Sequence, residues 1–208
     1  MLETFLTIRE NEYFAEVVEK KSKFIAFLTK VDSEEEALQK IEQIKKQHRD
    51  ARHNVFAYRI ANKMERYSDD GEPSGTAGVP ILDILRGEKL QNVLVVVTRY
   101  FGGILLGTGG LVKAYSTAAK DAITSSEKVE MRLCNELEIE IDYNYYNILL
   151  HCFKELSIMV RDTVFLDKVH LNIIVGVSES EMIKDKIIEK TDRTAKVILK
   201  ETYYHEWL

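Results

Sequence analysis

The sequence predicts an α+β protein with two domains, covering residues 1–128 and 129–208. The first observation is that nine of the ten glycines and both prolines lie between Gly71 and Gly110, among otherwise regular apolar patterns. Because glycine and proline set unusual backbone geometry, we expect this window to be a structured site rather than a linker. The second observation is that the chain after Arg132 follows the order β-α-β-β-α-β, which predicts a ferredoxin-like domain. The polar stretch Ser125–Arg132 marks the boundary.

The elements of the first domain follow from apolar periodicity and local signals. Glu12–Glu19 and Ser22–Val31 have the pattern of two strands joined by a short turn. Ser33, with Glu36 three residues later, forms a capping box that predicts the start of a helix. The remaining expected elements are, in order, a strand at His53–Ile60, its hairpin partner at Lys63–Tyr67, a short helix at Pro80–Arg86, a buried strand at Asn92–Thr98 and a helix at Leu111–Ile123.

The second domain begins with a strand whose two faces differ in polarity. Four apolar residues alternate with four acids, in the pairs Glu136-Leu137, Glu138-Ile139, Glu140-Ile141 and Asp142-Tyr143. The elements expected next are a helix at Tyr145–Glu155, strands at Ile158–Leu166 and Val169–Val177, a helix from Ser178 to Lys190, and a strand at Lys196–Tyr204. If the apolar side chains face the helices, the acids project from the open face of the sheet. They would repel phosphates, so we expect this face to suit a basic protein partner and not RNA.

Charge and hydropathy exclude several classes of protein. The net charge of −5 and the pI near 5.7 argue against non-specific coating of nucleic acid. Up to Met131 there are 19 Lys and Arg against 20 Asp and Glu, and afterwards 10 against 14, so a polyanion would favour the first part. No run approaches the ~18 apolar residues of a membrane span, and no signal-peptide pattern is seen. With only two cysteines, Cys134 and Cys152, we expect a cytoplasmic protein without membrane contact.

The segment 67–80 carries the first group of candidate site residues. Asp69, Asp70 and Glu72 lie within four positions, beside Ser74 and Thr76. Close carboxylates can cap backbone donors in a turn, contact a ligand or partner, or serve metal binding and acid–base chemistry. The sequence leaves all three interpretations open.

Histidines give no metal signature. His48 and His53 flank the start of an expected strand but lack a third ligand, so no zinc site is predicted. We interpret His53 as a packed or hydrogen-bonded residue near the ligand or partner loop. The sequence contains no HExxH or GxSxG motif, and it implies neither a catalytic residue nor a cofactor.

The segment 98–115 carries the second group, in which a buried strand enters a glycine-rich turn and then a helix. Backbone N–H groups at such a turn favour an anion. Arg99 would grip a phosphate, Lys113 would add positive charge, and Thr108 would donate a hydroxyl or cap the helix. The glycines of the expected anion cradle are Gly102, Gly103, Gly107, Gly109 and Gly110. Because P-loop and dinucleotide fingerprints are absent, strand–helix packing, anion or nucleic-acid contact, and nucleotide hydrolysis all stay open.

Four blocks of sequence together resemble the YigZ/IMPACT family. They are Ser22-Lys-Phe24, His53-Asn-Val-Phe-Ala-Tyr58, Ser68-Asp-Asp-Gly-Glu-Pro-Ser-Gly-Thr-Ala-Gly78 with Pro80, and Arg99-Tyr-Phe-Gly-Gly103 continuing through Leu106-Gly-Thr-Gly-Gly-Leu-Val-Lys-Ala-Tyr115. The blocks lie within residues 15–125. The rest of the chain is similar to the C-terminal domain of bacterial YigZ-type members.

The resemblance implies a fold for each domain and a role in translation. The first domain would be like the second domain of small-subunit ribosomal protein five, and the second like the last domain of elongation factor G. Both folds occur in the translation machinery, and eukaryotic IMPACT proteins regulate translation under amino-acid stress. Those proteins use an additional N-terminal domain for that role, so their mechanism is not carried over to this sequence.

Two hypotheses of function follow from the sequence and the resemblance. The leading one is a non-enzymatic, translation-associated protein that contacts RNA or the ribosome through its first domain. Arg99, Lys113 and the backbone of Gly103–Gly110 would contact phosphate, and the acids of the first segment would shape the rim or orient Arg99. The alternative is an enzyme or binding protein for a small phosphorylated or nucleotide-like ligand at the same two segments.

Overall fold

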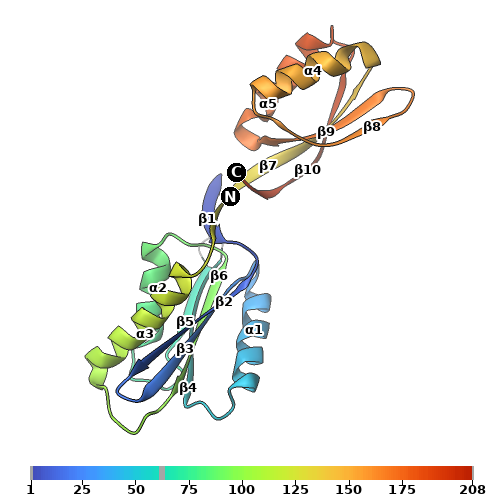
Figure 1. Ribbon diagram of the computed structural model, residues 1–208. Helices are drawn as coiled ribbons and strands as arrows, with labels where there is room; N and C mark the ends of the chain where they lie inside the picture. The colour runs from blue at the N-terminus through green and yellow to red at the C-terminus, as the bar shows by residue number, and fades with distance from the viewer. Residues whose placement is uncertain (1, 61–63, 208) are drawn as a thin grey trace. The chain divides into compact units, whose positions relative to one another are not determined.

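The computed structural model describes residues 2–60 and 64–207, which divide into two compact units, Met1–Glu130 and Met131–Leu208 (Figure 1). We call them unit 1 and unit 2 and describe each by itself. Helices combine with antiparallel sheets in both, so the predicted α+β class is confirmed. Within the described ranges, no helix is long and apolar enough to cross a membrane.

Unit 1 is built on a five-stranded antiparallel sheet in the order β2-β3-β6-β4-β5. Its strands are β2 (Glu12–Glu19), β3 (Ser22–Lys30), β4 (His53–Ile60), β5 (Met64–Ser68) and β6 (Val93–Tyr100). The central strand β6 pairs Arg99 with Phe24 of β3 on one side and with His53 of β4 on the other. The hairpin partner of β4 was expected from Lys63, which lies outside the described residues.

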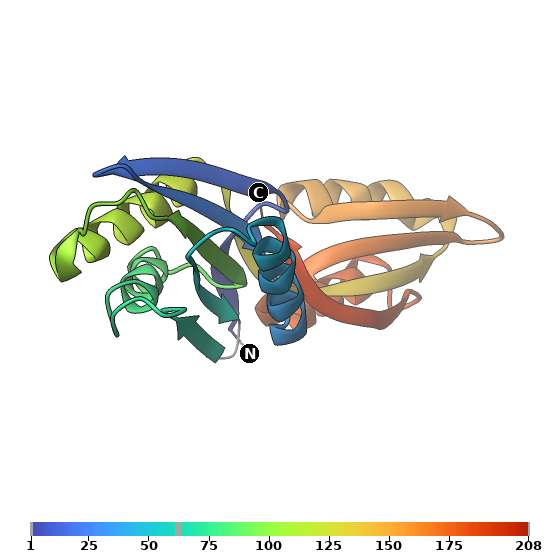
Figure 2. The ribbon, with the colours of Figure 1, turned by 90° about the horizontal axis from the view of Figure 1, so that it is seen from below.

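Three helices cover the two faces of this sheet: α1 (Glu34–Gln47), α2 (Gly78–Gly87) and α3 (Gly107–Thr124). Figures 1 and 2 show α2 and α3 on one face and α1 on the other. Alternate residues of β6 enter the two apolar cores. Val93, Val95 and Val97 pack with α2 and α3, whereas Leu94 and Val96 pack with α1.

Helices α2 and α3 begin earlier than expected. α2 starts at Gly78 rather than Pro80, because proline is tolerated in a first helical turn, where its missing N–H is not needed. α3 starts at Gly107 rather than Leu111. The residues Gly107–Gly110 therefore form the first turn of a helix, not a loop in front of one.

Other local predictions have mixed outcomes. The cap of α1 is confirmed, since the N–H of Glu36 donates to Ser33 Oγ at 3.1 Å. The helix expected from Ser178 begins at Ser180 instead, after a short 3-10 turn. The strand β1 (Thr4–Ile8), which pairs with β7, was not expected.

Unit 2 has the element order β-α-β-β-α-β. Its elements are β7 (Lys128–Ile141, beginning in the last residues of unit 1), α4 (Tyr143–Glu155), β8 (Met159–Phe165), β9 (Val169–Gly176), α5 (Ser180–Lys190) and β10 (Lys196–Glu206). The sheet order is β10-β7-β9-β8, with every pair antiparallel. One apolar cluster joins both helices to alternate residues of β7 and β9, so the helices share one face of the sheet.

The acids on the opposite face of unit 2 do not form the free acidic surface that the sequence predicted. The predicted alternation ends at Ile141, because Tyr143 is the first residue of α4. Three of the acids are neutralised by cations of neighbouring strands and turns, in the ion pairs Glu136–Arg161, Glu138–Lys200 and Glu140–Lys168. The argument for a basic protein partner loses its main support.

Candidate functional site

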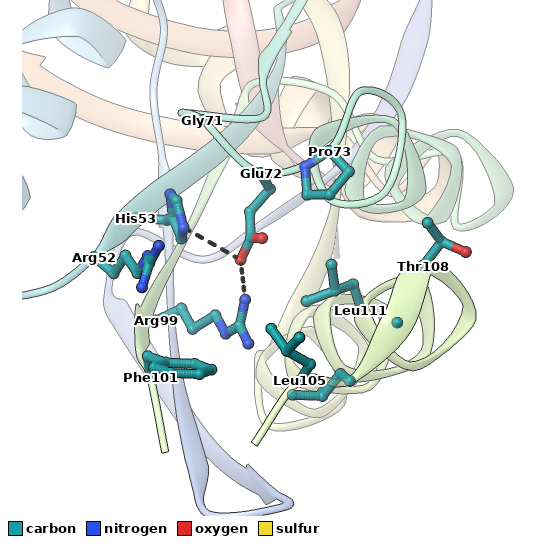
Figure 3. A pocket seen from close by; sticks show the side chains of 12 residues that line it. Arg52, His53, Gly71, Glu72, Pro73, Arg99, Phe101, Leu105, Thr108 and Leu111 are labelled. Atoms are coloured by element: carbon teal, nitrogen blue, oxygen red, sulfur yellow. Dashed lines mark hydrogen bonds and ion pairs between the residues drawn. The ribbon is translucent and has the colours of Figure 1, made fainter. Parts of the chain in front are cut away.

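A pocket of about 350 Å³ lies in unit 1 where β4, β6 and α3 meet the first glycine-rich segment (Figure 3). Figure 3 shows His53, Glu72 and Arg99 on one side of the pocket, with Leu105, Leu111 and Thr108 across from them. The residues that line the pocket are Arg52, His53, Gly71, Glu72, Pro73, Arg99, Phe101, Leu105, Leu106, Gly107, Thr108 and Leu111. The pocket therefore joins both segments that the sequence singled out.

The polar side of the pocket is built on a buried ion pair. Arg99 Nη1 donates to Glu72 Oε1 at 2.6 Å, and their side chains are only 6% and 3% exposed. The hydroxyl of Tyr115, a buried residue of α3, donates to the same carboxylate oxygen at 2.8 Å. Burial, and then the charge of Glu72, raise the pKa of Tyr115 well above its usual range, so its phenol stays a donor. Arg99, which was expected to grip a phosphate, is thus paired with Glu72, one of the acids expected to shape the rim or orient it.

Sheet register explains why these side chains meet. Arg99 lies near the end of β6 and is opposite His53, the first residue of β4. Its guanidinium also lies over the ring of Phe24, its partner in β3, at 5.4 Å from the ring centroid. Residues far apart in the sequence are therefore held at one end of three adjacent strands.

His53 is oriented by the first glycine-rich segment. Its Nδ1 lies 2.7 Å from the backbone carbonyl oxygen of Asp70. Because a carbonyl can only accept, Nδ1 carries the proton in this contact. The other ring nitrogen, Nε2, lies 3.9 Å from Glu72 Oε1, which is too long for a hydrogen bond.

The other residues of that segment hold the loop together. Asp69 accepts from the N–H groups of Gly75, Ala77 and Gly78 at 2.9, 3.1 and 2.8 Å, respectively, at the start of α2. Asp70 accepts from the N–H of Asn54 at 2.7 Å. Thr76 donates to the carbonyl of Pro73, and Ser74 is exposed. Of the three acids, only Glu72 lines the pocket, and the described part of the chain holds no group of three or more residues suited to a metal ion.

The first turn of α3 forms part of the opposite side. No side chain caps this helix, so its first N–H groups have no partner within the helix. Gly107 has φ +73°, and a Cβ at Gly107 or Gly109 would meet no atom within 4 Å. An anion can thus approach the backbone, as the sequence predicted for a helix N-terminus.

The remaining members of the predicted anion cradle have other positions. A Cβ at Gly102 would lie 2.0 Å from the backbone of Lys21, so this glycine permits close packing of two segments of the chain. A Cβ at Gly110 would lie 3.0 Å from the Cβ of Leu106, and Gly103 is exposed. Lys113 is exposed on α3 but does not line the pocket.

Sequence reasoning missed several residues of this site, among them Arg52, Phe101 and Leu105. Arg52 is exposed and lies over the ring of Phe101, at 5.4 Å from its centroid, and among the described residues no carboxylate pairs with it. Leu105 is 82% exposed at the rim. The position of Arg52 next to His53 at the start of a strand was the only signal that could have identified it.

The fold and the pocket define a two-unit α+β protein with a ligand-sized cleft beside a helix N-terminus. Residues 20–123 match the Impact N-terminal domain family. The IMPACT family member YvyE of Bacillus subtilis (strain 168) is 35% identical over 209 residues, which cover 99% of this chain and 95% of YvyE. The chain therefore belongs to the IMPACT family, and the predicted family is confirmed.

Two solved structures are similar to this chain. The crystal structure of a hypothetical protein is 28% identical, with a TM-score of 0.64, and the match covers 97% of this chain and 99% of that one. The two-domain translational regulator Yih1 is 29% identical, with a TM-score of 0.41, over 56% of this chain and 48% of that one.

Proposed function

We propose that this protein is a translation-associated regulatory protein that binds RNA, free or in the ribosome, through phosphate contacts at the pocket of unit 1. The observation that carries the proposal is the uncapped first turn of α3, which opens on this pocket. An α-helix of 18 residues has partial positive charge at its N-terminus, where a phosphate is stabilised. Membership of the IMPACT family supports the link to translation.

The geometry changes the roles that the sequence suggested. Thr108 and the N–H groups of the first turn of α3 contact phosphate, and Arg52 supplies the unpaired positive charge at the pocket. Arg99 is a positioning residue, because its charge is paired with Glu72. The function is binding rather than catalysis, since Asp69 and Asp70 are occupied by backbone donors.

We also propose particular folds for the two domains, 1–128 and 129–208. The order β10-β7-β9-β8 with two helices on one face supports a ferredoxin-like fold, similar to the last domain of elongation factor G. The family supports a first domain like the second domain of small-subunit ribosomal protein five. A protein acting on ribosomes would work in the cytoplasm.

Cosedimentation with purified ribosomes at low and moderate salt tests this function. We expect binding that weakens with salt, and weaker binding still for Arg52→Ala and Thr108→Val. Lys120→Ala is the control, because it removes one positive charge from the exposed surface of α3 outside the pocket. Absence of binding by the unmodified protein, or equal losses in all three variants, would refute the proposal.

The size of the pocket favours a second candidate, a small phosphorylated or nucleotide-like ligand. A volume of about 350 Å³ lies in the range of small-molecule sites. A thermal-shift screen with nucleotides and phosphosugars separates the two functions, because a saturating ligand raises the unfolding temperature. No shift with any of these compounds would count against this candidate.

A further inference from the structure

One oxygen of the buried carboxylate in the pocket has no protein partner. Both hydrogen bonds to Glu72, from Arg99 and from Tyr115, end on Oε1. No hydrogen bond among the described residues ends on Oε2, although the side chain is only 3% exposed. Figure 3 shows this second oxygen on the side that faces Leu111, which lines the pocket. Oε2 is not among the fully buried polar atoms that lack a partner, so it keeps some accessible surface. A ligand in the pocket that donates a hydrogen bond can therefore take the place of water at this oxygen.

A second polar atom lies on the same side of the pocket. The Nδ1–H of His53 is held by the carbonyl of Asp70, and the other ring nitrogen, Nε2, has no hydrogen-bond partner among the described residues. Nε2 is on the side of Glu72, at 3.9 Å from its Oε1. The carboxylate and this ring nitrogen thus converge where the polar groups of a bound ligand would be placed.

The rest of the pocket attracts negative charge. The first turn of α3 presents backbone donors across from Glu72, and Arg52 adds an unpaired guanidinium. The charge of Glu72 itself is balanced by Arg99. A ligand must therefore carry an anion together with uncharged donors, since an ammonium group would be repelled by these cations.

We propose that the pocket binds a ribose-phosphate unit of RNA, in which Glu72 Oε2 accepts the ribose 2′-hydroxyl and the first turn of α3 receives the phosphate. Ribose-phosphate combines both required features within one repeating unit of the polymer. The 2′-hydroxyl is a donor that DNA lacks, so this contact makes the protein selective for RNA over DNA. The inference rests on the proposed phosphate contact but goes beyond it, because phosphate alone does not distinguish the two polymers.

Binding of short, single-stranded oligonucleotides of one mixed sequence tests the inference in the full-length protein. Fluorescence anisotropy at fixed salt would compare RNA, DNA and 2′-O-methyl RNA, of which the last keeps the sugar pucker but loses the donor. We expect RNA to bind roughly tenfold more tightly than either analogue, the effect of one hydrogen bond to a charged group. Equal binding of all three would overturn the hydroxyl contact and leave the phosphate proposal standing. No binding of any would overturn both.

Variants connect the selectivity to Glu72. Glu72→Gln should bring the RNA-to-DNA affinity ratio close to one, whereas Lys120→Ala, outside the pocket, should preserve it. Arg52→Ala should weaken RNA and DNA binding by the same factor. If Glu72→Gln fails to fold, the comparison of 2′-O-methyl RNA with RNA in the unmodified protein still decides the question. Retention of the ratio in a folded Glu72→Gln variant would overturn the assignment.

A further experiment distinguishes RNA from a free nucleotide, which also carries a ribose hydroxyl and a phosphate. Titration of AMP and 2′-deoxy-AMP, followed by calorimetry, should give much weaker binding than the RNA oligonucleotide, because only the polymer engages Arg52 and α3 with successive phosphates. Binding of AMP with no binding of RNA would overturn RNA as the ligand.

Discussion

A cation in a pocket can either contact a ligand or hold another residue in position. Arg99 holds Glu72 in position. Their side chains are 6% and 3% exposed, and the cation also lies over two rings, Phe24 and Phe101. Taking one partner out of such a pair leaves a buried charge without compensation. Substitution of Arg99 is therefore expected to lower the stability of the protein even when no ligand is bound.

The first prediction concerns this pair. Arg99→Ala should lower the free energy of unfolding by about 3–5 kcal/mol, because it leaves the Glu72 carboxylate buried and unpaired. Urea denaturation followed by circular dichroism measures the loss. The double variant Glu72→Gln/Arg99→Gln should recover part of it by removing both charges. A stable Arg99→Ala protein with lost RNA binding would instead show that Arg99 contacts the phosphate directly.

The second prediction concerns Tyr58 of β4, whose hydroxyl donates to Glu34 of α1 at 2.6 Å. Burial, followed by this hydrogen bond, raises the pKa of Tyr58 from 10.0 to about 12. As the pH rises, the unfolded chain loses this proton before the folded protein does. The contribution of Tyr58 to the free energy of unfolding is therefore fully present below about pH 10 and is lost between pH 10 and pH 12. Urea midpoints across this range should decline less steeply in Tyr58→Phe. Parallel curves for the two proteins would contradict the assignment.

At the scale of elements, the first turn of α3 shows what the sequence could and could not predict. Glycine spacing identified an anion-favouring backbone, but propensity placed the helix start at Leu111, since four residues including three glycines are poor helix formers. Tertiary packing of Leu106 and Leu111 extends the helix over them. Most strands were predicted closely because their apolar patterns are strong. The exceptions are β7, which begins at Lys128 within the stretch interpreted as a polar boundary, and β1, which is short and whose partner β7 lies far along the chain.

The pocket itself could not be derived from sequence patterns. Its charged residues were visible, but their burial depends on the register of β4 against β6, which places His53 opposite Arg99. A change of register by one residue would move these side chains to the other face. For the same reason, the sequence could not show that Lys113 lies outside the pocket while Arg52 lines it.

The third prediction compares two glycines of α3. Gly109→Ala should stabilise the protein by up to about 1 kcal/mol, because the methyl group meets no atom within 4 Å and alanine favours helix. Gly107→Ala should destabilise it, since residue 107 has φ +73°. Thermal unfolding distinguishes the two. Under the proposed function, Gly107→Ala should also weaken RNA binding severalfold, because Gly107 lines the pocket and a methyl group there would obstruct the backbone, whereas Gly109→Ala should have little effect. Unchanged RNA affinity in a folded Gly107→Ala variant would indicate that phosphate does not approach this turn.

At the scale of the whole molecule, charge limits how RNA can be bound. The net charge is −5, and the acids of β7 that were expected to attract a basic partner are paired within unit 2. A protein with this balance gains little from long-range attraction to a polyanion. Binding must therefore depend on a few local contacts, unlike the basic surface of a protein that coats nucleic acid.

The fourth prediction follows from this limit. For single-stranded RNA, the slope of log K against log salt is about −0.7 for each phosphate neutralised. A small pocket should thus give a shallow slope, and Arg52→Ala should reduce its magnitude by about 0.7, because this variant removes one neutralising charge. Lys120→Ala, which alters the net charge equally but lies outside the pocket, should leave the slope unchanged. A steep slope that both variants lower equally would mean that a diffuse surface binds RNA, and the pocket of unit 1 would no longer explain the function.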